Sequence, residues 1–200
     1  MKTTTLHLAT GNTHKVQEMQ RLADNSGLPV RIVPAVKMPR VVEDTGTFVG
    51  NARKKAAALR ATLAADAWVL ADDSGLCVDA LSGAPGVESA YYAGSQGDSA
   101  ANLAKLVQVL RDVPDGERGA HFTCVLVLID NAGCEQVFEG RCDGRLLREP
   151  RGGAGFGYDP LFVPAGHKKS LAEIDETSKN KLSHRGKAWV RLCDRWPKGR

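Results

Sequence analysis

The sequence predicts a sheet protein of the α/β or α+β class. Its first half alternates strand-like apolar segments with helical ones, and its second half holds two consecutive strand-like segments. Alternation of this kind is typical of a sheet covered by helices, whereas the later pair is typical of antiparallel strands. Ligands of such proteins bind at strand ends, so we expect functional residues there.

The individual elements follow from hydrophobic spacing and from turn residues. Residues 4–9 alternate and run into a Gly-Asn turn, and Val16, Met19 and Leu22 then recur at helical spacing. An alanine-rich segment and two later segments with one apolar face are further helices. We expect strands at 4–9, 28–33, 67–71, 120–129 and 136–140, helices at 14–23, 48–64, 99–112 and 183–195, and loops at 34–47 and 83–94. The strand at 67–71 is expected to stop at Asp72.

Composition is that of one globular domain spanning residues 1–200, with 42% hydrophobic and 25% charged residues. A net charge of +4 and 6% aromatic residues do not favour a nucleic-acid partner, but suit a small anionic substrate. The five cysteines form no CxxC pair and are expected to be reduced thiols. The N-terminus is too short and polar for a signal peptide and no apolar run reaches membrane-spanning length, so we expect a cytoplasmic protein without a membrane partner.

A first candidate site lies where the first strand passes into a helix. Its residues are Thr10, Gly11, Asn12, Thr13, His14 and Lys15. A helix N-terminus offers free N–H groups and a positive dipole end to an anion, and Lys15 adds a charge. The spacing is not that of a P-loop. A capped Gly-Asn turn without a ligand explains the same residues.

A second candidate site is the acidic pair Asp72-Asp73. Adjacent carboxylates repel one another unless a cation or donors compensate. Mg²⁺ takes one or two carboxylates with water and phosphate, and Glu43 or Asp44 can add a third acid. The alternative makes Asp73 a helix or turn cap, leaves Asp72 exposed and places Glu43 and Asp44 in a solvated loop. Lys55, on the helix expected at 48–64, either reaches the same phosphate or belongs to a charged outer face.

A third candidate site combines a glycine-rich segment, GGAGFGYDP at 152–160, with His184-Arg185. Phe156 and Tyr158 offer flat faces, while Asp159 and the basic pair offer hydrogen bonds. Stacking and edge recognition together suit a planar heterocycle. The alternative is a surface loop followed by a basic helix start.

These segments, taken in order, resemble the inosine triphosphate pyrophosphatase family. The matching stretches are LATGNTHKVQEM, TFVGNARKKA, LADDSGLCVDALSGAPGVESAYYAG, REPRGGAGFGYDPLFVP and SKNKLSHRGKA, which together span nearly the whole chain. The resemblance implies an elongated, two-lobed α/β fold with a central mixed sheet flanked by helices and a substrate cleft between the lobes. It also implies a homodimer that uses Mg²⁺ to hydrolyse ITP, dITP and XTP to the monophosphate and pyrophosphate.

The resemblance also implies roles for individual residues. Asp73 would be the general base and, with Glu43, a Mg²⁺ ligand. Substrate contacts would come from Thr10, Asn12, Lys15 and Lys55 at the triphosphate, from Ser74, from Phe156, Gly157, Tyr158 and Asp159 at the base and sugar, and from Lys179, His184 and Arg185 at the base edge. Arg185 would donate to the 6-oxygen that hypoxanthine and xanthine carry and adenine lacks.

Two positions depart from the family pattern. Tyr91 stands where an arginine is usual, and Gly50 stands where many members have a glutamate before Asn51. The alternative function is a nucleotide-binding regulator without turnover, for which Asp72 and Asp73 would be dispensable.

Overall fold

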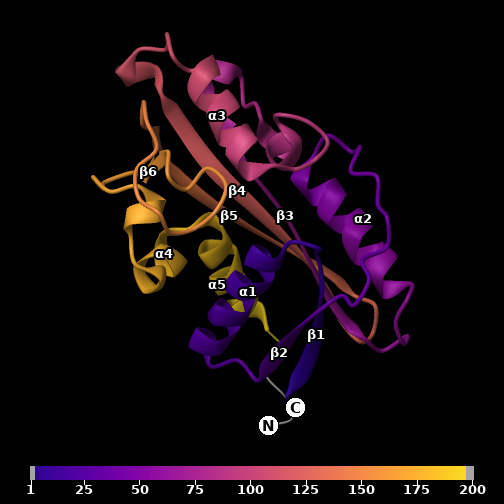
Figure 1. Ribbon diagram of the computed structural model, residues 1–200. Helices are drawn as coiled ribbons and strands as arrows, with labels where there is room; N and C mark the ends of the chain where they lie inside the picture. The colour runs from indigo at the N-terminus through magenta and orange to yellow at the C-terminus, as the bar shows by residue number, and fades with distance from the viewer. Residues whose placement is uncertain (1–2, 197–200) are drawn as a thin grey trace. The chain divides into compact units, whose positions relative to one another are not determined.

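The computed structural model describes residues 3–196 and contains a mixed six-stranded sheet with flanking helices (Figure 1). The strands are β1 (Thr4–Ala9), β2 (Val30–Pro34), β3 (Trp68–Val78), β4 (Gly119–Ile129), β5 (Glu135–Leu146) and β6 (Phe162–Pro164). The helices are α1 (Thr13–Ser26), α2 (Phe48–Arg60), α3 (Ser99–Val109), α4 (Glu176–Leu182) and α5 (His184–Arg195). Short 3₁₀ turns lie at Asp79–Leu81, Gly86–Tyr91, Asp115–Glu117 and Leu171–Glu173.

The sheet order is β2-β1-β3-β4-β5-β6. β1 pairs in parallel with both β2 and β3, whereas β5 and β6 are antiparallel. Parallel strands joined by helices define the first half of the chain, so the structure confirms the α/β class. None of the helices within residues 3–196 is long and apolar enough to cross a membrane.

Several element boundaries differ from the sequence-based expectation. The strand expected at 67–71 continues to Val78, and the strand expected at 136–140 continues to Leu146. β6 and α4 were not expected at all, because three and seven residues are too few to show a clear period. The extension of β3 matters most, since it places Asp72 and Asp73 inside a strand.

The described chain forms two compact units. The first contains the chain up to Asp73, the segment Cys124–Gly140 and the chain from Arg185 onward, and the second contains Ser74–Thr123 and Arg141–His184. The strands β3, β4 and β5 contribute residues to both. The single domain over 1–200, the elongated shape and the cleft expected from the family stay predictions.

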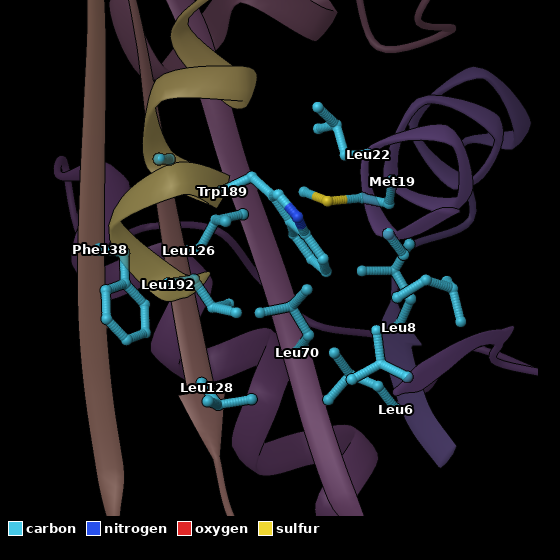
Figure 2. Close-up of a cluster of buried hydrophobic side chains, with 14 of the residues drawn as sticks. Leu6, Leu8, Met19, Leu22, Leu70, Leu126, Leu128, Phe138, Trp189 and Leu192 are labelled. Atoms are coloured by element: carbon cyan, nitrogen blue, oxygen red, sulfur yellow. The ribbon is translucent and has the colours of Figure 1, made fainter. Parts of the chain in front are cut away.

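One side of the sheet in the first unit is covered by α1 and α5. Leu8 of β1, Leu70 of β3 and Leu126 of β4 are fully buried in one apolar cluster with Met19 of α1. Figure 2 shows Trp189 of α5 pointing into this cluster between Met19 and Leu70. Full burial of one such side chain stabilises the folded protein by about 1.5–3 kcal/mol. This cluster therefore fixes both helices on the sheet.

The other side of the same sheet is covered by α2 (Figure 1). Ala9, Ala71 and Val125 alternate with the residues of the first cluster and pack against Ala52 and Ala56 of the helix. Alternate side chains of a strand point to opposite faces, which is why the two clusters share the same three strands. Small residues on both sides bring α2 close to β3.

The second unit has its own core around Leu76, Phe122 and Leu106. Arg118 is buried beside this core and donates to the backbone carbonyls of Leu110 at 2.7 Å and Leu146 at 3.0 Å. The guanidinium therefore ties the end of α3 to the end of β5.

Candidate functional site

The two acids of the ADDSG segment lie in the middle of β3 and point to opposite faces of the sheet. Leu70 belongs to the cluster under α1 and α5, and Ala71 belongs to the cluster under α2. The alternation of the strand therefore sends Asp72 toward α1 and α5, and Asp73 toward α2. Both side chains are buried. The expectation that the two carboxylates act as an adjacent pair at a strand end is wrong.

Asp73 lies in a cluster with one lysine and one further acid. The Nζ atom of Lys55 donates to Asp73 Oδ1 at 2.6 Å and to Glu43 Oε2 at 2.9 Å. Lys55 reaches this position because it lies on the buried face of α2, together with Ala52 and Ala56. The two carboxylates assigned to the metal, Glu43 and Asp73, thus converge on Lys55, one of the residues assigned to the triphosphate.

The loop that carries Glu43 is held by Asn51, a role that sequence reasoning missed. Asn51 Oδ1 accepts from the backbone N–H of Thr45 at 3.2 Å and from its hydroxyl at 2.8 Å. A side chain at Gly50 would overlap the Thr45 and Thr47 hydroxyls. The glycine that departs from the family pattern therefore allows close approach of this loop to the start of α2. A buried asparagine in a helix was the available signal.

Electrostatics at Asp73 favour proton uptake near neutral pH. Burial raises the pKa of Asp73 to about 6, with the charge of Glu43 acting in the same direction and Lys55 opposing both. Burial works against the charge of Lys55, but Asp73 and Glu43 outweigh it and raise the lysine's pKa. Asp73 Oδ2 is buried and has no hydrogen-bond partner among the residues that the structure describes. Such an atom is a free acceptor for a proton, a donor or a cation.

The donor set at this cluster fits a hard divalent cation. Glu43 and Asp73 already bring their carboxylates together around one positive charge, and Asp73 Oδ2 retains a free lone pair. Within residues 3–196 no group of three or more metal-binding side chains is present. A cation bound through one or two carboxylates, with water and phosphate completing its shell, is the usual Mg²⁺ arrangement.

Asp72 is the fully buried centre of a separate ionic cluster. Arg185 of α5 donates to Asp72 Oδ2 at 2.9 Å, and Lys15 of α1 forms an ion pair with Oδ1. Burial raises the pKa of Asp72, but Arg185 and Lys15 outweigh it and hold the pKa well below its usual range. Cys124 on β4 donates its thiol to Oδ2 at 3.2 Å, because burial and the Asp72 charge raise the thiol's pKa and keep it protonated. Asp72 thus joins α1, β4 and α5.

Arg185 binds a second carboxylate in this cluster. Its guanidinium also pairs with Glu18, which follows Lys15 by three residues on the same helix. Arg185 thus forms ion pairs with Asp72 and Glu18, both in the first unit. Its role at the base edge stays a prediction. Glu18 was missed by sequence reasoning, although a charged residue within the apolar stripe of a helix is a signal for a buried partner.

The turn before α1 has the geometry expected for a helix start. Asn12 is the N-cap and accepts from the backbone N–H groups of His14 at 2.9 Å and Lys15 at 3.2 Å. Thr10 accepts from the N–H of Asn12 at 3.1 Å, which closes the turn. Gly11, Asn12, Thr13 and His14 are exposed. The expected cap is therefore present, on an exposed helix N-terminus of the kind that attracts anions.

The second unit brings together Phe156, Asp159 and Lys179. Asp159 Oδ2 accepts from the backbone N–H of Phe156 at 2.9 Å and from Lys179 Nζ at 2.8 Å. The same Nζ lies 5.4 Å from the centre of the half-buried Phe156 ring. Gly155 and Gly157 have φ angles of 78° and 62°, which side chains rarely adopt. The turn thus presents the aromatic ring of Phe156 beside the ammonium group of Lys179, a residue that only the family resemblance pointed to.

Three other residues assigned to the substrate, Tyr158, His184 and Ser74, also lie in this unit. Tyr158 is buried in the second core, and its hydroxyl donates to the carbonyl of Ser89 at 2.9 Å. Burial raises the pKa of Tyr158, which therefore stays protonated. The His184 ring is stacked on Phe122, with 4.7 Å between ring centres. Ser74 is half-buried in β3. Contacts of these residues with a substrate stay predictions.

The fold defines the class of the protein: an α/β protein with a mixed sheet, two charged clusters in its first unit and a glycine-rich turn in its second. An exposed helix N-terminus and two lysines that pair with acids lie in the first unit, and an aromatic ring beside a lysine lies in the second. The chain belongs to the Ham1 family, which it matches over residues 6–195. The resemblance stated from the ordered segments is thereby confirmed.

Comparison with individual proteins gives the same family. The chain is 62% identical over 196 residues to a dITP/XTP pyrophosphatase of Opitutus terrae, with 94% of this chain and 97% of that protein covered. Its fold is similar to that of a HAM1 protein from Coxiella burnetii, with a TM-score of 0.81, 38% identity and coverage of 96% and 97%. It is also similar to a nucleoside-triphosphatase/dITP/XTP pyrophosphatase from Mycobacterium abscessus, with a TM-score of 0.72, 41% identity and coverage of 94% and 97%.

Proposed function

We propose that this protein hydrolyses non-standard purine nucleoside triphosphates such as ITP, dITP and XTP to the monophosphate and pyrophosphate, with Mg²⁺ as cofactor. The observation that carries the proposal is the buried Asp73, which has a free acceptor atom and shares Lys55 with Glu43. The names of the similar proteins support the substrate class. A homodimer in the cytoplasm stays a prediction from the family resemblance.

The triphosphate is assigned to the start of α1 and to two lysines. Thr10 and Asn12 shape an exposed turn in front of the helix N-terminus, which favours negative charge. Lys15 keeps 15% of its side chain exposed while it binds Asp72, so its ammonium can serve an anion as well. Lys55 supplies the second positive charge.

Glu43 and Asp73 are the residues that would hold Mg²⁺. The ion, when bound, neutralises phosphate charge and makes water a stronger acid. Asp73 accepts the proton of the attacking water at Oδ2. The water oxygen bonds to the α-phosphorus, the bond from this phosphorus to the bridging oxygen breaks, and pyrophosphate leaves. Without the metal, burial raises the pKa of Asp73 to about 6, which favours proton uptake by this carboxylate.

The purine base is assigned to Phe156 and Lys179. A half-buried ring gives the base a stacking surface, and the neighbouring ammonium is a donor. Hypoxanthine and xanthine carry an acceptor oxygen at the 6-position, whereas adenine carries an amino donor, which cannot accept a hydrogen bond from the Lys179 ammonium. A site built for a hydrogen bond strongly rejects an analogue that cannot make it.

Replacement of Asp73 tests the catalytic assignment. In Asp73→Asn we expect kcat for ITP to fall by about 10²–10⁴-fold, the usual contribution of a positioned base. Binding of a non-hydrolysable ITP analogue, measured by calorimetry, should persist. Asp112→Asn is a control, because Asp112 is exposed and pairs with the neighbouring, exposed Arg111. Normal turnover by Asp73→Asn would show that another group is the base.

A nucleotide panel tests the reaction itself. Pyrophosphate release is measured for ITP, XTP, dITP, GTP and ATP, with Mg²⁺ and with a chelator. We expect turnover only with the metal, a higher kcat/KM for ITP than for ATP, and a smaller ratio in Lys179→Met. Nucleotide binding without any turnover would instead support the regulator considered from the sequence.

A further inference from the structure

Lys55 is placed where a metal cation would be held. Its ammonium lies 2.6 Å from Asp73 Oδ1 and 2.9 Å from Glu43 Oε2. The side chains of Lys55 and Asp73 are 10% and 8% exposed, so water contributes little screening to this pair. Glu43 is 32% exposed and closes the cluster on the outer side.

The charges of this cluster do not balance by themselves. One ammonium faces two carboxylates, and Asp73 Oδ2 has no hydrogen-bond partner among the described residues. A divalent cation on the same two carboxylates would compensate them fully. It would also face Lys55 at the distance of an ion pair, where two positive charges repel one another strongly.

We propose that the Lys55 ammonium is the resident cation of the metal-free site, and that a divalent cation binds Glu43 and Asp73 in competition with it. The inference rests on the proposed function, because it concerns the metal of that reaction. Metal binding then releases the lysine from both carboxylates and makes its charge available to the substrate's phosphate oxygens. Lys55 would therefore become available to bind phosphate only when the metal is bound.

This arrangement makes an unusual prediction about loss of the lysine. A residue that merely supports the site would weaken metal binding when it is removed. A competing cation has the opposite effect: its removal leaves two unneutralised carboxylates and tightens metal binding, although turnover falls because the phosphate loses a contact. Weaker metal binding after loss of Lys55 therefore indicates a supporting residue, whereas tighter metal binding indicates a competing cation.

The test measures Mn²⁺ affinity of the nucleotide-free protein from the electron paramagnetic resonance signal of free Mn²⁺. We expect Lys55→Met to bind Mn²⁺ about tenfold more tightly than wild type, a difference of about 1.4 kcal/mol, and to lose kcat/KM for ITP. Arg53→Met is the matched control. Arg53 lies on the same helix, carries the same charge and pairs with a different acid, Glu135, at 2.8 Å. Its Mn²⁺ affinity should remain that of wild type.

Unchanged or weaker Mn²⁺ binding in Lys55→Met overturns the inference, as does an equal gain in Arg53→Met, which would reflect net charge alone. Absence of Mn²⁺ binding in wild type and in Lys55→Met also overturns it. ITP hydrolysis by wild type is measured in the same preparations. If wild type hydrolyses ITP, the proposed function stands even when these outcomes overturn the competition between Lys55 and the metal.

A measurement on the unaltered protein covers the case in which Lys55→Met does not fold. The side-chain ammonium signals of the lysines are followed by nuclear magnetic resonance while Mg²⁺ is added. We expect the Lys55 signal, assigned with Lys55→Arg, to shift to that of a solvent-exposed ammonium at saturating Mg²⁺. A Lys55 signal that keeps its metal-free position at saturation overturns the inference.

Discussion

Replacement of Arg185 by methionine tests whether the buried ionic cluster holds α5 on the sheet. The substitution removes a guanidinium that is 2% exposed and leaves Asp72 and Glu18 without their shared partner. Breaking a buried pair from one side costs about 3–5 kcal/mol, because the remaining charge stays desolvated. Asp72 keeps Lys15, so the lower end of this range is expected. For a chain of this length the loss lowers Tm by about 2–4 °C per kcal/mol, or about 6–12 °C in all.

The assay is thermal unfolding followed by circular dichroism near neutral pH. Arg191→Met is the control on the same helix, since Arg191 is exposed and donates to the carbonyl of Glu139 at 2.6 Å. Its free energy of unfolding should stay within about 0.5 kcal/mol of wild type. The double substitution Arg185→Met with Glu18→Gln should recover part of the loss, because it removes an uncompensated charge. A Tm of Arg185→Met equal to that of wild type would refute the energetic role assigned to the cluster.

Three further predictions concern single residues. Asp72→Asn should lower the free energy of unfolding, measured with urea over a pH series. Because the pKa of Asp72 is lowered by folding, its ionised carboxylate stabilises the fold at pH values above the ordinary pKa of 3.8. This stabilisation is lost as the pH falls through the lowered pKa. Tyr158→Phe should cost about 1 kcal/mol of stability through the lost hydrogen bond to Ser89 and leave KM for ITP unchanged; a raised KM would point to substrate contact. Gly155→Ala should cost about 1–2 kcal/mol, since its φ of 78° is unfavourable for alanine, and should raise KM because the methyl group would displace Asp159; unchanged kinetics would contradict this.

The sequence was a good guide to the early elements. The apolar spacing of Val16, Met19 and Leu22 predicted α1, and the Gly-Asn turn predicted its cap at Asn12. These predictions succeeded because capping and helical periodicity depend on neighbours within one or two turns. The ordered segments also predicted the family, since several motifs in one order are far more specific than any of them alone.

Predictions about the end of β3 failed for a physical reason. Two consecutive aspartates look like the end of an apolar strand, because charged side chains rarely occupy a buried strand. Here each aspartate has a cation from a different helix, Arg185 for Asp72 and Lys55 for Asp73. Those partners are distant in the sequence, so no local pattern reveals that the strand continues.

By itself, the sequence determined the α/β class, the family and the set of chemically active residue types, because these depend on local periodicity and on motifs that can be recognised in order. Only the tertiary structure decided which charges meet. The alternation of β3 separates Asp72 from Asp73, and the packing of α2 and α5 on opposite faces gives each a different partner. Electrostatic energy depends on distance and burial, which arise only when the helices are packed on the sheet.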